Sequence, residues 1–247
     1  MTEITADRFL GGKLWVQQPS AGFRAGLDAV VLAASVPARA GEQVLELGSG
    51  CGTASLCLAA RVPGCDIVGL EIDKNLVGIA SGNANMNALA DRLHFVTGDV
   101  FAPPRVLRRV FNHVFANPPF HHSSDPGSTN VLRRHSTHDG AGLSAWLKAG
   151  LKRVRPGGTM TMIIRTDRLA EILEGSSAQG TTLLPLWARK GEPSKRIIVQ
   201  ARKGSRERLR LLPGLVLHEK DGTYTQTADS ILREGSALSL AADTNAE

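Results

Sequence analysis

The sequence lacks the features that would place it in a membrane or outside the cell. No apolar run among its 247 residues reaches the ~18 residues that a membrane-spanning helix needs. The start (1–5) has no basic stretch followed by an apolar one, so it does not resemble a signal peptide. There are three cysteines, Cys51, Cys57 and Cys65, and no pair has the two-residue spacing of a metal or redox site. These absences predict a cytoplasmic protein with reduced cysteines, no membrane partner and no metal site.

The length and composition are those of an ordinary folded domain. Hydrophobic residues make up 42 % of the chain and charged residues 21 %, close to the averages of soluble globular proteins. We predict one domain over residues 43–236. Residues 1–42 form a leader before it, and residues 237–247 form a small, polar tail that we expect to fray.

Positive charge is in excess and unevenly placed. The formal net charge is +6, and nine basic residues fall between positions 187 and 210, opposed by Glu192 and Glu207. An excess of positive charge favours polyanionic partners but does not specify one. Two interpretations stay open: a solvated basic face, or a surface that binds RNA through residues such as Lys195 and Arg196. The nine residues are Arg189, Lys190, Lys195, Arg196, Arg202, Lys203, Arg206, Arg208 and Arg210.

Short apolar runs alternate with segments of helical spacing from about residue 43 to residue 202. This alternation predicts an α/β sheet that is covered by helices on both faces. Strands are expected at 44–47, 66–70, 93–97, 113–116, 159–164, 182–187 and 195–200, and helices at 53–61, 76–89, 143–154 and 167–173.

A glycine-rich loop follows the first predicted strand of the domain. Gly48, Gly50 and Gly52 alternate with other residues, and Glu46 precedes them. Glycine lets the backbone turn sharply and approach a ligand closely. The spacing differs from the G-x-G-x-x-G of dinucleotide-binding loops, and no basic P-loop residue follows, so a phosphate-bearing nucleotide is disfavoured. The loop and Glu46 are a candidate cofactor site; the alternative is a structural glycine-rich turn.

Acidic residues follow the next two predicted strands. Glu71 ends the second strand, where a carboxylate can accept hydrogen bonds from both ribose hydroxyls. Asp99 follows the third strand and could accept from an adenine amino group, while the backbone N–H of Val100 could donate to the same ring. Open α/β sheets bind ligands beyond the carboxyl ends of their strands, so these residues are predicted to face the glycine loop.

A stiff turn, Asn117-Pro118-Pro119-Phe120, follows the fourth predicted strand. Two prolines fix the backbone and can aim the Asn117 side chain and the Pro118 carbonyl at one point. A planar amino group has two hydrogens and needs two such acceptors. The Phe120 ring could stack on the base that carries the amino group, with Pro119 beside it. The alternative is a structural turn with a core phenylalanine.

Both motifs resemble those of known methyltransferases. The E-x-G-x-G-x-G of residues 46–52 resembles motif I of the class I S-adenosylmethionine-dependent methyltransferases, and residues 117–120 resemble the N/D-P-P-Y/F motif of their amino-group members. This resemblance implies a Rossmann-like α/β fold with a seven-stranded, mostly parallel sheet whose seventh strand is antiparallel. It also implies S-adenosylmethionine as the cofactor and direct methyl transfer to an amino nitrogen. Phenylalanine in place of the commoner tyrosine keeps the stacking face.

Segments outside the motifs look like the bacterial valine-tRNA adenine-N6 methyltransferase group. They are the leader stretches 7–14, 17–19 and 22–34 and the late stretch 217–225. The resemblance implies RNA, above all tRNA, as the partner, and a leader that covers the cofactor, with Asp28 over its methionine end. An N-cap of the following helix is the alternative role for Asp28. A protein glutamine N-methyltransferase, a guanine-N2 methyltransferase of rRNA and a non-catalytic RNA-binding module remain alternative functions.

The segment after the turn combines basic and imidazole side chains. Arg133 and Arg134 could meet phosphates, and histidine rings could stack on bases. Either a substrate-binding loop or a disordered polar loop fits this composition, and the lack of paired cysteines disfavours a metal. The histidines are His121, His122, His135 and His138.

Overall fold

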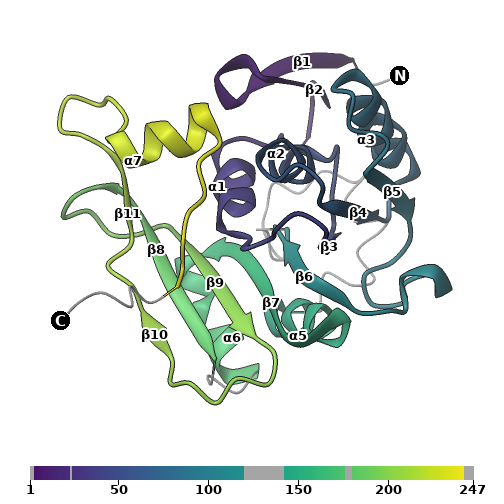
Figure 1. Cartoon of the computed structure of the whole chain (residues 1–247). Helices are drawn as coiled ribbons and strands as arrows, with labels where there is room; N and C mark the ends of the chain where they lie inside the picture. Colours follow the sequence, from purple (N-terminus) through teal and green to yellow (C-terminus); the bar gives the residue numbers. More distant parts are fainter. Residues whose placement is uncertain (1–2, 23, 120–141, 176–179, 242–247) are drawn as a thin grey trace.

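The computed structural model describes residues 3–22, 24–119, 142–175 and 180–241, and it contains the predicted α/β sheet (Figure 1). The seven main strands follow the order β5-β4-β3-β6-β7-β9-β8, and β9 is antiparallel to both neighbours. The class of fold, each of the seven expected strands and the antiparallel last strand are therefore confirmed. The strands are β3 (Gln43–Leu47), β4 (Asp66–Glu71), β5 (Leu93–Thr97), β6 (Phe111–Ala116), β7 (Val154–Arg165), β8 (Thr181–Arg189) and β9 (Arg196–Arg202).

The sheet has nine strands, not the seven that were expected. β10 (Arg210–Leu211) and β11 (Leu215–His218) pair one after the other with the outer edge of β8. Gly214, at φ +95°, lies in the turn between them, and a Cβ there would come within 2.4 Å of Nε1 of Trp187. Both strands are too short to show the alternation of apolar and polar residues from which strands are predicted.

Helices cover both faces of this sheet (Figure 1). The strands alternate their side chains between the two cores: in β6, Phe115 points to one core, and Val114 and Ala116 point to the other. Parallel strands that are buried on both faces need this double cover. The helices α1 (Leu27–Ser35), α2 (Thr53–Arg61) and α3 (Lys74–Met86) cover one face, and α5 (Leu143–Arg153) and α6 (Leu169–Gly175) cover the other.

The leader is a folded part of the domain. β1 (Ile4–Phe9) and β2 (Leu14–Pro19) form an antiparallel hairpin joined by the short helix η1 (Leu10–Gly12). Two asparagines of the α3 region pair with β2 as a neighbouring strand would. Asn83 accepts from the backbone N–H of Gln17 and donates to its carbonyl, and Asn87 makes the same two bonds with Trp15. The hairpin is thereby fixed against α3.

The end of the chain is docked as far as Leu240, against the expectation that it frays from residue 237. Leu240 is 4 % exposed, the backbone N–H of Leu238 donates to the carbonyl of Ala34, and Arg210 donates to the carbonyl of Leu240. The preceding segment, α7 (Gln226–Asp229) and η5 (Ser230–Glu234), contributes Ala228 and Ile231 to the same core as the leader. Apolar residues spaced through a polar tail were enough to anchor it.

The strand directions define two edges of the sheet. β3, β4, β5, β6 and β7 all end at what we call the carboxyl edge, and β9 begins there. The opposite side, where these parallel strands begin and β9 ends, is the amino edge. The chain passes from β3 to β4 on one side and returns to β6 on the other, so the ligand-binding crevice of such a sheet is expected at the carboxyl edge between β3 and β6.

Candidate active site

The glycine loop lies at the carboxyl end of β3 and has the backbone that its sequence predicts. Gly48, Gly50 and Gly52 have φ values of +69°, +55° and +82°, which disfavour residues with a side chain. A Cβ at Gly52 would lie 2.5 Å from the Phe95 ring, whereas a Cβ at Gly50 would meet nothing within 4 Å among the described residues. The loop is therefore tightly packed beneath and open above Gly50, as a ligand cradle requires.

Glu71 connects the end of β4 to this loop. Its Oε2 accepts from the backbone N–H of Gly50 at 2.8 Å, and its Oε1 accepts from the N–H groups of Ile72 and Asp73 at 2.8 and 3.0 Å. The side chain is buried. Each carboxylate oxygen accepts about two hydrogen bonds, so Oε2 keeps the capacity for a ligand hydroxyl. The predicted contact to both ribose hydroxyls would require Oε1 to give up a backbone partner.

Glu46 lies under the loop and has a partner of its own. Its Oε2 accepts from the backbone N–H of Ser55 at 3.2 Å and from the Ser55 hydroxyl, at the start of α2. Burial raises the pKa of Glu46 to about 8, so the carboxyl group is mainly protonated at neutral pH. These contacts join the end of β3 to the first turn of α2, the two elements that flank the loop, and the predicted contact of Glu46 with the cofactor stays a prediction.

Replacing Glu46 by Gln should flatten the dependence of stability on pH. The pKa of Glu46 rises from the ordinary value of 4.5 to about 8 on folding, so the folded state holds the proton more tightly. The resulting stabilisation is complete below about pH 4.5 and is lost as the pH rises through about 8. Thermal unfolding between these limits should show the wild type losing stability relative to Glu46→Gln. A constant difference between the two proteins would contradict the protonated state.

Two apolar residues that sequence reasoning missed adjoin the acids. Ile72, directly after Glu71, is 44 % exposed, although it is aliphatic. Trp146 of α5 reaches the other side of the loop, where a Cβ at Gly48 would lie 3.0 Å from its ring. Trp146 also packs edge to face on Phe101, with ring centroids 5.8 Å apart. The position of Ile72, directly after the candidate sugar-binding acid Glu71, is a local signal that could have indicated a role at the site. Nothing local in the sequence places Trp146 here.

The third acid is held in the same region. Asp99 accepts from the backbone N–H of Phe101 at 2.8 Å, in a tight turn that follows β5. Val100, between them, packs against the core under α5. The turn therefore sets Phe101 against Trp146, while Asp99 and Val100 follow the end of β5 at the carboxyl edge. Their contacts with an adenine ring stay a prediction.

The Asn117 turn leaves β6 at the same edge. The Asn117 Oδ1 atom is buried and has no hydrogen-bond partner in the described part of the chain. Pro118 is buried and Pro119 is exposed, while Phe120 lies outside the described residues. A buried acceptor without a donor costs free energy unless a ligand satisfies it. This atom is therefore the strongest sign of a binding site that awaits an N–H donor.

An ion pair that the sequence analysis did not identify contacts both the Asn117 turn and the first turn of α5. Arg168 donates to the carbonyl of Pro119 at 3.3 Å and makes a two-pronged pair with Glu171 at 2.6 and 2.8 Å. Glu171 in turn accepts from the backbone N–H of Leu143, in the first turn of α5. One pair thus joins the Asn117 turn to α5 and α6. Its members are three residues apart, a spacing that by itself indicates no more than a surface pair.

The leader packs directly against the glycine loop. Asn83 donates to the carbonyl of Cys51 at 3.0 Å, and the Gln18 amide oxygen accepts from the Cys51 thiol at 3.7 Å. The same amide group pairs with the backbone N–H and carbonyl of Ala25. The leader, through Gln18, and α3, through Asn83, therefore both contact the loop by amide groups that no motif predicts.

Asp28 and Arg196, predicted to bind cofactor and RNA, pair with each other at 3.0 Å. Asp28 is in the first turn of α1, whose N-cap is Gly26, so the alternative that Asp28 caps the helix is wrong. Arg196 begins β9 and is already engaged by a carboxylate. The pair joins the leader to the sheet at the carboxyl edge, and the predicted ligand contacts of both residues stay predictions.

The basic run of residues 187–210 is divided between the two edges. Because β9 crosses the whole sheet, the residues before it and those after it lie at opposite ends. Arg133 and Arg134, the other predicted RNA contacts, lie outside the described residues, as do the four histidines near them. Arg189, Lys190, Lys195 and Arg196 are at the carboxyl edge, and Arg202, Lys203, Arg206, Arg208 and Arg210 are at the amino edge.

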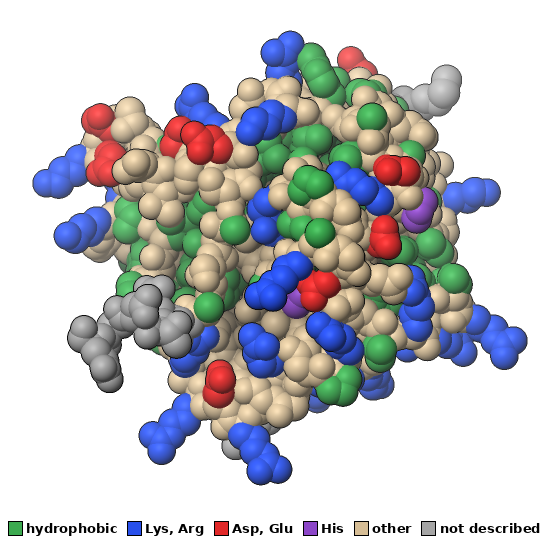
Figure 2. Space-filling model, in the orientation of Figure 1, with side chains coloured by type: hydrophobic (Ala, Val, Ile, Leu, Met, Phe, Trp, Pro, Cys, Tyr) green, Lys and Arg blue, Asp and Glu red, His purple; other side chains and the backbone are tan. Residues whose placement is uncertain are grey.

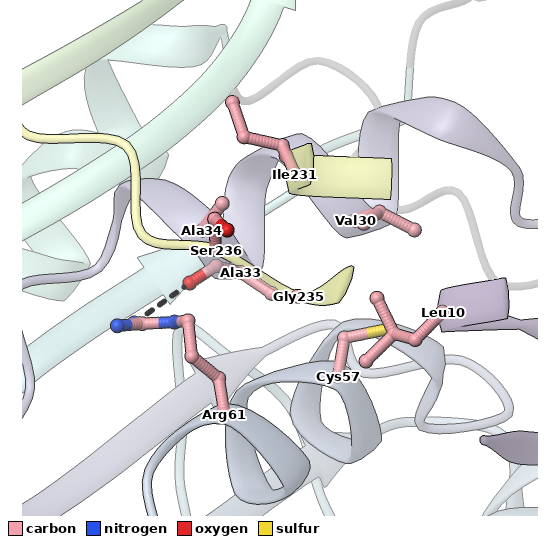
Figure 3. A pocket seen from close by; sticks show the side chains of 9 residues that line it. All are labelled: Leu10, Val30, Ala33, Ala34, Cys57, Arg61, Ile231, Gly235 and Ser236. Atoms are coloured by element: carbon pink, nitrogen blue, oxygen red, sulfur yellow. Dashed lines mark hydrogen bonds between the residues drawn. The ribbon is translucent and has the colours of Figure 1, made fainter. Parts of the chain in front are cut away.

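A small cavity lies away from this site, between α1, α2 and η5 (Figure 3). Its volume of about 10 Å³ has room for one water molecule, so it is no cofactor pocket. Arg61 borders the cavity and donates to the carbonyls of Ala33 and Val36, which satisfies the end of α1. The cavity belongs to the contact between the leader helix and the domain.

Two solved structures that share this fold are named as methyltransferases. The chain superposes on a predicted O-methyltransferase from Agrobacterium tumefaciens with a TM-score of 0.72, over 86 % of this chain and 98 % of that one, at 24 % identity. For the T. thermophilus 16S rRNA N2 G1207 methyltransferase in complex with AdoMet and guanosine, the TM-score is 0.53 and the identity 21 %, over 81 % of this chain and 50 % of that one. The strand order and the single antiparallel main strand define the class I Rossmann-like methyltransferase fold.

The family follows from the sequence match. Residues 25–171 match the methyltransferase small domain, and the chain belongs to this family. It is an S-adenosylmethionine-dependent methyltransferase. A similar curated protein is the tRNA1(Val) (adenine(37)-N6)-methyltransferase of Shewanella baltica strain OS155, 26 % identical over 89 % of this chain and 94 % of that one. The protein of the same name from Bacteroides thetaiotaomicron is 28 % identical over 71 % and 75 %.

The residues at the carboxyl edge fit the cofactor. The space above Gly50 admits a ligand, Glu71 has an acceptor to spare, and Ile72 offers an exposed apolar face to a flat ring. In the described part of the chain, no helix is long and apolar enough to cross a bilayer.

Proposed function

We propose that this methyltransferase modifies the N6 amino group of an adenine in RNA, with valine tRNA as the substrate and the cytoplasm as its location. The observation that carries the proposal is the buried, unpartnered Oδ1 of Asn117 at the carboxyl end of β6, within the described residues. An exocyclic amino group can donate to it, and the neighbouring Pro118 carbonyl can accept the second hydrogen. The curated relatives named above supply the choice of adenine N6 and of valine tRNA.

The residues of this chain are assigned the task of aligning the amino nitrogen of the substrate with the methyl group of the cofactor. Bound S-adenosylmethionine supplies an electrophilic methyl group, and the amino nitrogen must approach it in line with the carbon–sulfur bond. Asn117 and the Pro118 carbonyl hold the amino hydrogens and help the nitrogen lone pair leave conjugation with the ring. Phe120 is assigned to stack on the base, and Pro119, Lys195, Arg133 and Arg134 to contact the RNA around it. No strong base is needed, since the proton leaves after the nitrogen has become cationic.

The test is transfer of labelled methyl from the cofactor to separate pools of RNA, protein and DNA. We expect label in RNA, released as N6-methyladenosine on nucleoside analysis. A valine tRNA transcript should accept it, and a matched transcript with guanine in place of adenine 37 should not. Label in protein as N-methylglutamine would replace this proposal by the glutamine alternative. Label as N2-methylguanosine would replace it by the guanine alternative.

Removing Arg168 should slow methyl transfer without weakening cofactor binding. Arg168 holds the Pro119 carbonyl, one residue from the proposed acceptor, and small misplacements of reacting groups cost up to ~100-fold in rate. Arg168→Ala should therefore lower kcat by ~10- to 100-fold. Arg168→Lys keeps the charge but not the two-pronged pair, so its kcat should lie between those of the wild type and of Arg168→Ala.

The control is Arg233→Ala, which removes the exposed pair between Arg233 of η5 and Asp229 of α7. It should leave kcat and the cofactor Kd unchanged. If Arg168→Ala changes only the melting temperature, the Arg168–Glu171 pair is structural and does not position the turn.

A further inference from the structure

Basic side chains gather at the amino edge of the sheet, on the side opposite the Asn117 turn. The second half of the basic run lies there, and the strands β6 and β7 begin beside it. Figure 2 shows the lysines and arginines of this face around α5 and the β9–β10 connection. We call these ten residues the amino-edge cluster: Arg108, Arg109, Lys152, Arg153, Arg155, Arg202, Lys203, Arg206, Arg208 and Arg210.

The members of the cluster are joined into one surface by the backbone beneath them. Arg202 donates to the carbonyl of Gly157 at 3.1 Å, and the Lys203 ammonium group donates to the carbonyl of Val154 at 2.7 Å. The Lys203 backbone also pairs with Gly157 and Gly158 in both directions. The end of β9 and the start of β7 therefore hold these cations in fixed places.

The cluster differs from the carboxyl edge in its charge balance. Among the described residues, Arg155 is the member with an acidic partner, Glu42 at 3.4 Å, and Glu42 also accepts from His113 at 3.1 Å. Lys190 and Lys195 at the carboxyl edge likewise have no acidic partner among the described residues, but the four described arginines there all pair with acids. Those pairs are Arg165–Asp167, Arg168–Glu171, Arg189–Glu192 and Arg196–Asp28.

The ten cations outnumber the acids among them, Glu42 and Glu207, and therefore repel one another. The hydrogen bonds that Arg202, Lys203 and Arg210 donate to backbone carbonyls hold these side chains in place but do not neutralise their charge. A polyanion relieves this repulsion and gains free energy from counterion release. The spread of the cluster over three connections suits a chain of phosphates better than a single anion. Because the proposed substrate is RNA, the ligand that matches this surface is a ribose-phosphate backbone.

We propose that the amino-edge cluster binds backbone phosphates of the substrate RNA at a distance from the methylated adenine. This inference rests on the proposed function. Six residue steps along β9 separate Arg196 from Arg202, so the two edges are ~20 Å apart. A short loop around the target adenine reaches one edge, and a folded tRNA reaches both.

The experiment compares Arg206→Glu/Arg208→Glu with Lys220→Glu/Arg233→Glu, which changes the net charge equally outside the cluster. Arg206 and Arg208 are exposed members of the β9–β10 connection. Binding of a full-length valine tRNA transcript is measured against salt concentration, together with binding of a short hairpin that carries adenine 37. Thermal unfolding and cofactor binding check that all variants fold.

We expect the cluster variant to bind the full-length transcript roughly tenfold or more weakly and to lower the salt slope by ~0.7–0.9 per lost phosphate contact. Its affinity for the hairpin and its kcat should equal those of the wild type, and the KM for the transcript should rise. The control variant should resemble the wild type with both RNAs.

Three outcomes would overturn the inference. Unchanged binding of the transcript would leave the cluster a solvated face, and equal weakening by the control pair would show a general charge effect. If the cluster variant loses binding to vesicles of phosphatidylserine and phosphatidylcholine but not to tRNA, the polyanion is a membrane surface. If the wild type methylates RNA in each case, the proposed function still stands.

Discussion

Asn117→Ala should reduce the turnover of RNA methylation by ~100- to 1000-fold while the affinity for S-adenosylmethionine stays the same. This corresponds to about 2.7–4 kcal/mol, the cost of removing one preorganised polar group from an active site. The effect falls on kcat because the amino nitrogen becomes cationic in the transition state, and its hydrogens then bind the Asn117 oxygen more strongly than in the ground state.

The structure also predicts the effect of this substitution on stability, because the Asn117 side chain should lower the free energy of unfolding of the protein without its substrate. The Oδ1 of Asn117 is buried and has no partner among the described residues. Removing an unsatisfied acceptor relieves a desolvation cost, so Asn117→Ala should keep or raise the melting temperature. A loss of activity together with retained stability is what distinguishes a catalytic role from a turn residue.

The matched control is Asn112→Ala, at the opposite end of β6, at the amino edge. Asn112 accepts from the backbone N–H of Gln43 at 3.0 Å and donates to Glu42 at 3.2 Å, so its replacement should lower stability and leave kcat unchanged. Both variants are assayed on the valine tRNA transcript and titrated with the cofactor by calorimetry. If Asn117→Ala methylates at the wild-type rate, the amino-group mechanism is wrong, and carbon or ribose methylation must be considered.

The catalytic edge was predictable from the sequence because its signals are local. Apolar runs mark the strands, and glycine, acidic and proline residues directly follow them. In a parallel sheet, residues that follow strands must meet at one edge, so the positions of the Gly48 loop, Glu71, Asp99 and Asn117 follow from the order of elements alone. The structure confirms that these segments lie at that edge.

Contacts between distant segments were not predictable in the same way. Asp28 and Arg196 are separated by 168 residues, so the sequence predicts a ligand for each of them and gives no sign of their mutual pair. The basic run is continuous in the sequence, but the antiparallel direction of β9 sends its two halves to opposite edges. The sequence gives the number of basic residues, whereas the direction of β9 determines at which edge of the sheet each of them lies.

The supporting residues of the site also escaped prediction. Asn83 and Gln18 act through buried amides, and Arg168 acts through a carbonyl, so none of them belongs to a motif with a fixed spacing. Such residues show their role only when the backbone groups that they satisfy are known. They explain why the leader and α6, which hold no predicted catalytic group, belong to the same domain.

Glu71→Ala should weaken the binding of S-adenosylmethionine by about 1.5–3 kcal/mol, or ~10- to 150-fold in Kd. This is the value of one hydrogen bond to a charged acceptor, and one is what the geometry allows. Oε1 already accepts from Ile72 and Asp73, whereas Oε2 accepts from Gly50 alone among the described residues and can take a ribose hydroxyl.

Glu71→Gln tests the same geometry more finely. A glutamine amide has one accepting oxygen, so its NH₂ group must face either Gly50 or the N–H groups of Ile72 and Asp73, all of which are donors. The isosteric change should therefore weaken cofactor binding as well and should not restore the wild-type Kd. Asp66→Ala, at the exposed start of the same strand, is the control and should bind the cofactor normally. Calorimetric titration of the three variants and the wild type decides between the outcomes. A wild-type Kd for a folded Glu71→Ala protein would show that the carboxylate only secures the loop, and the ribose would then have to be bound elsewhere along the carboxyl edge.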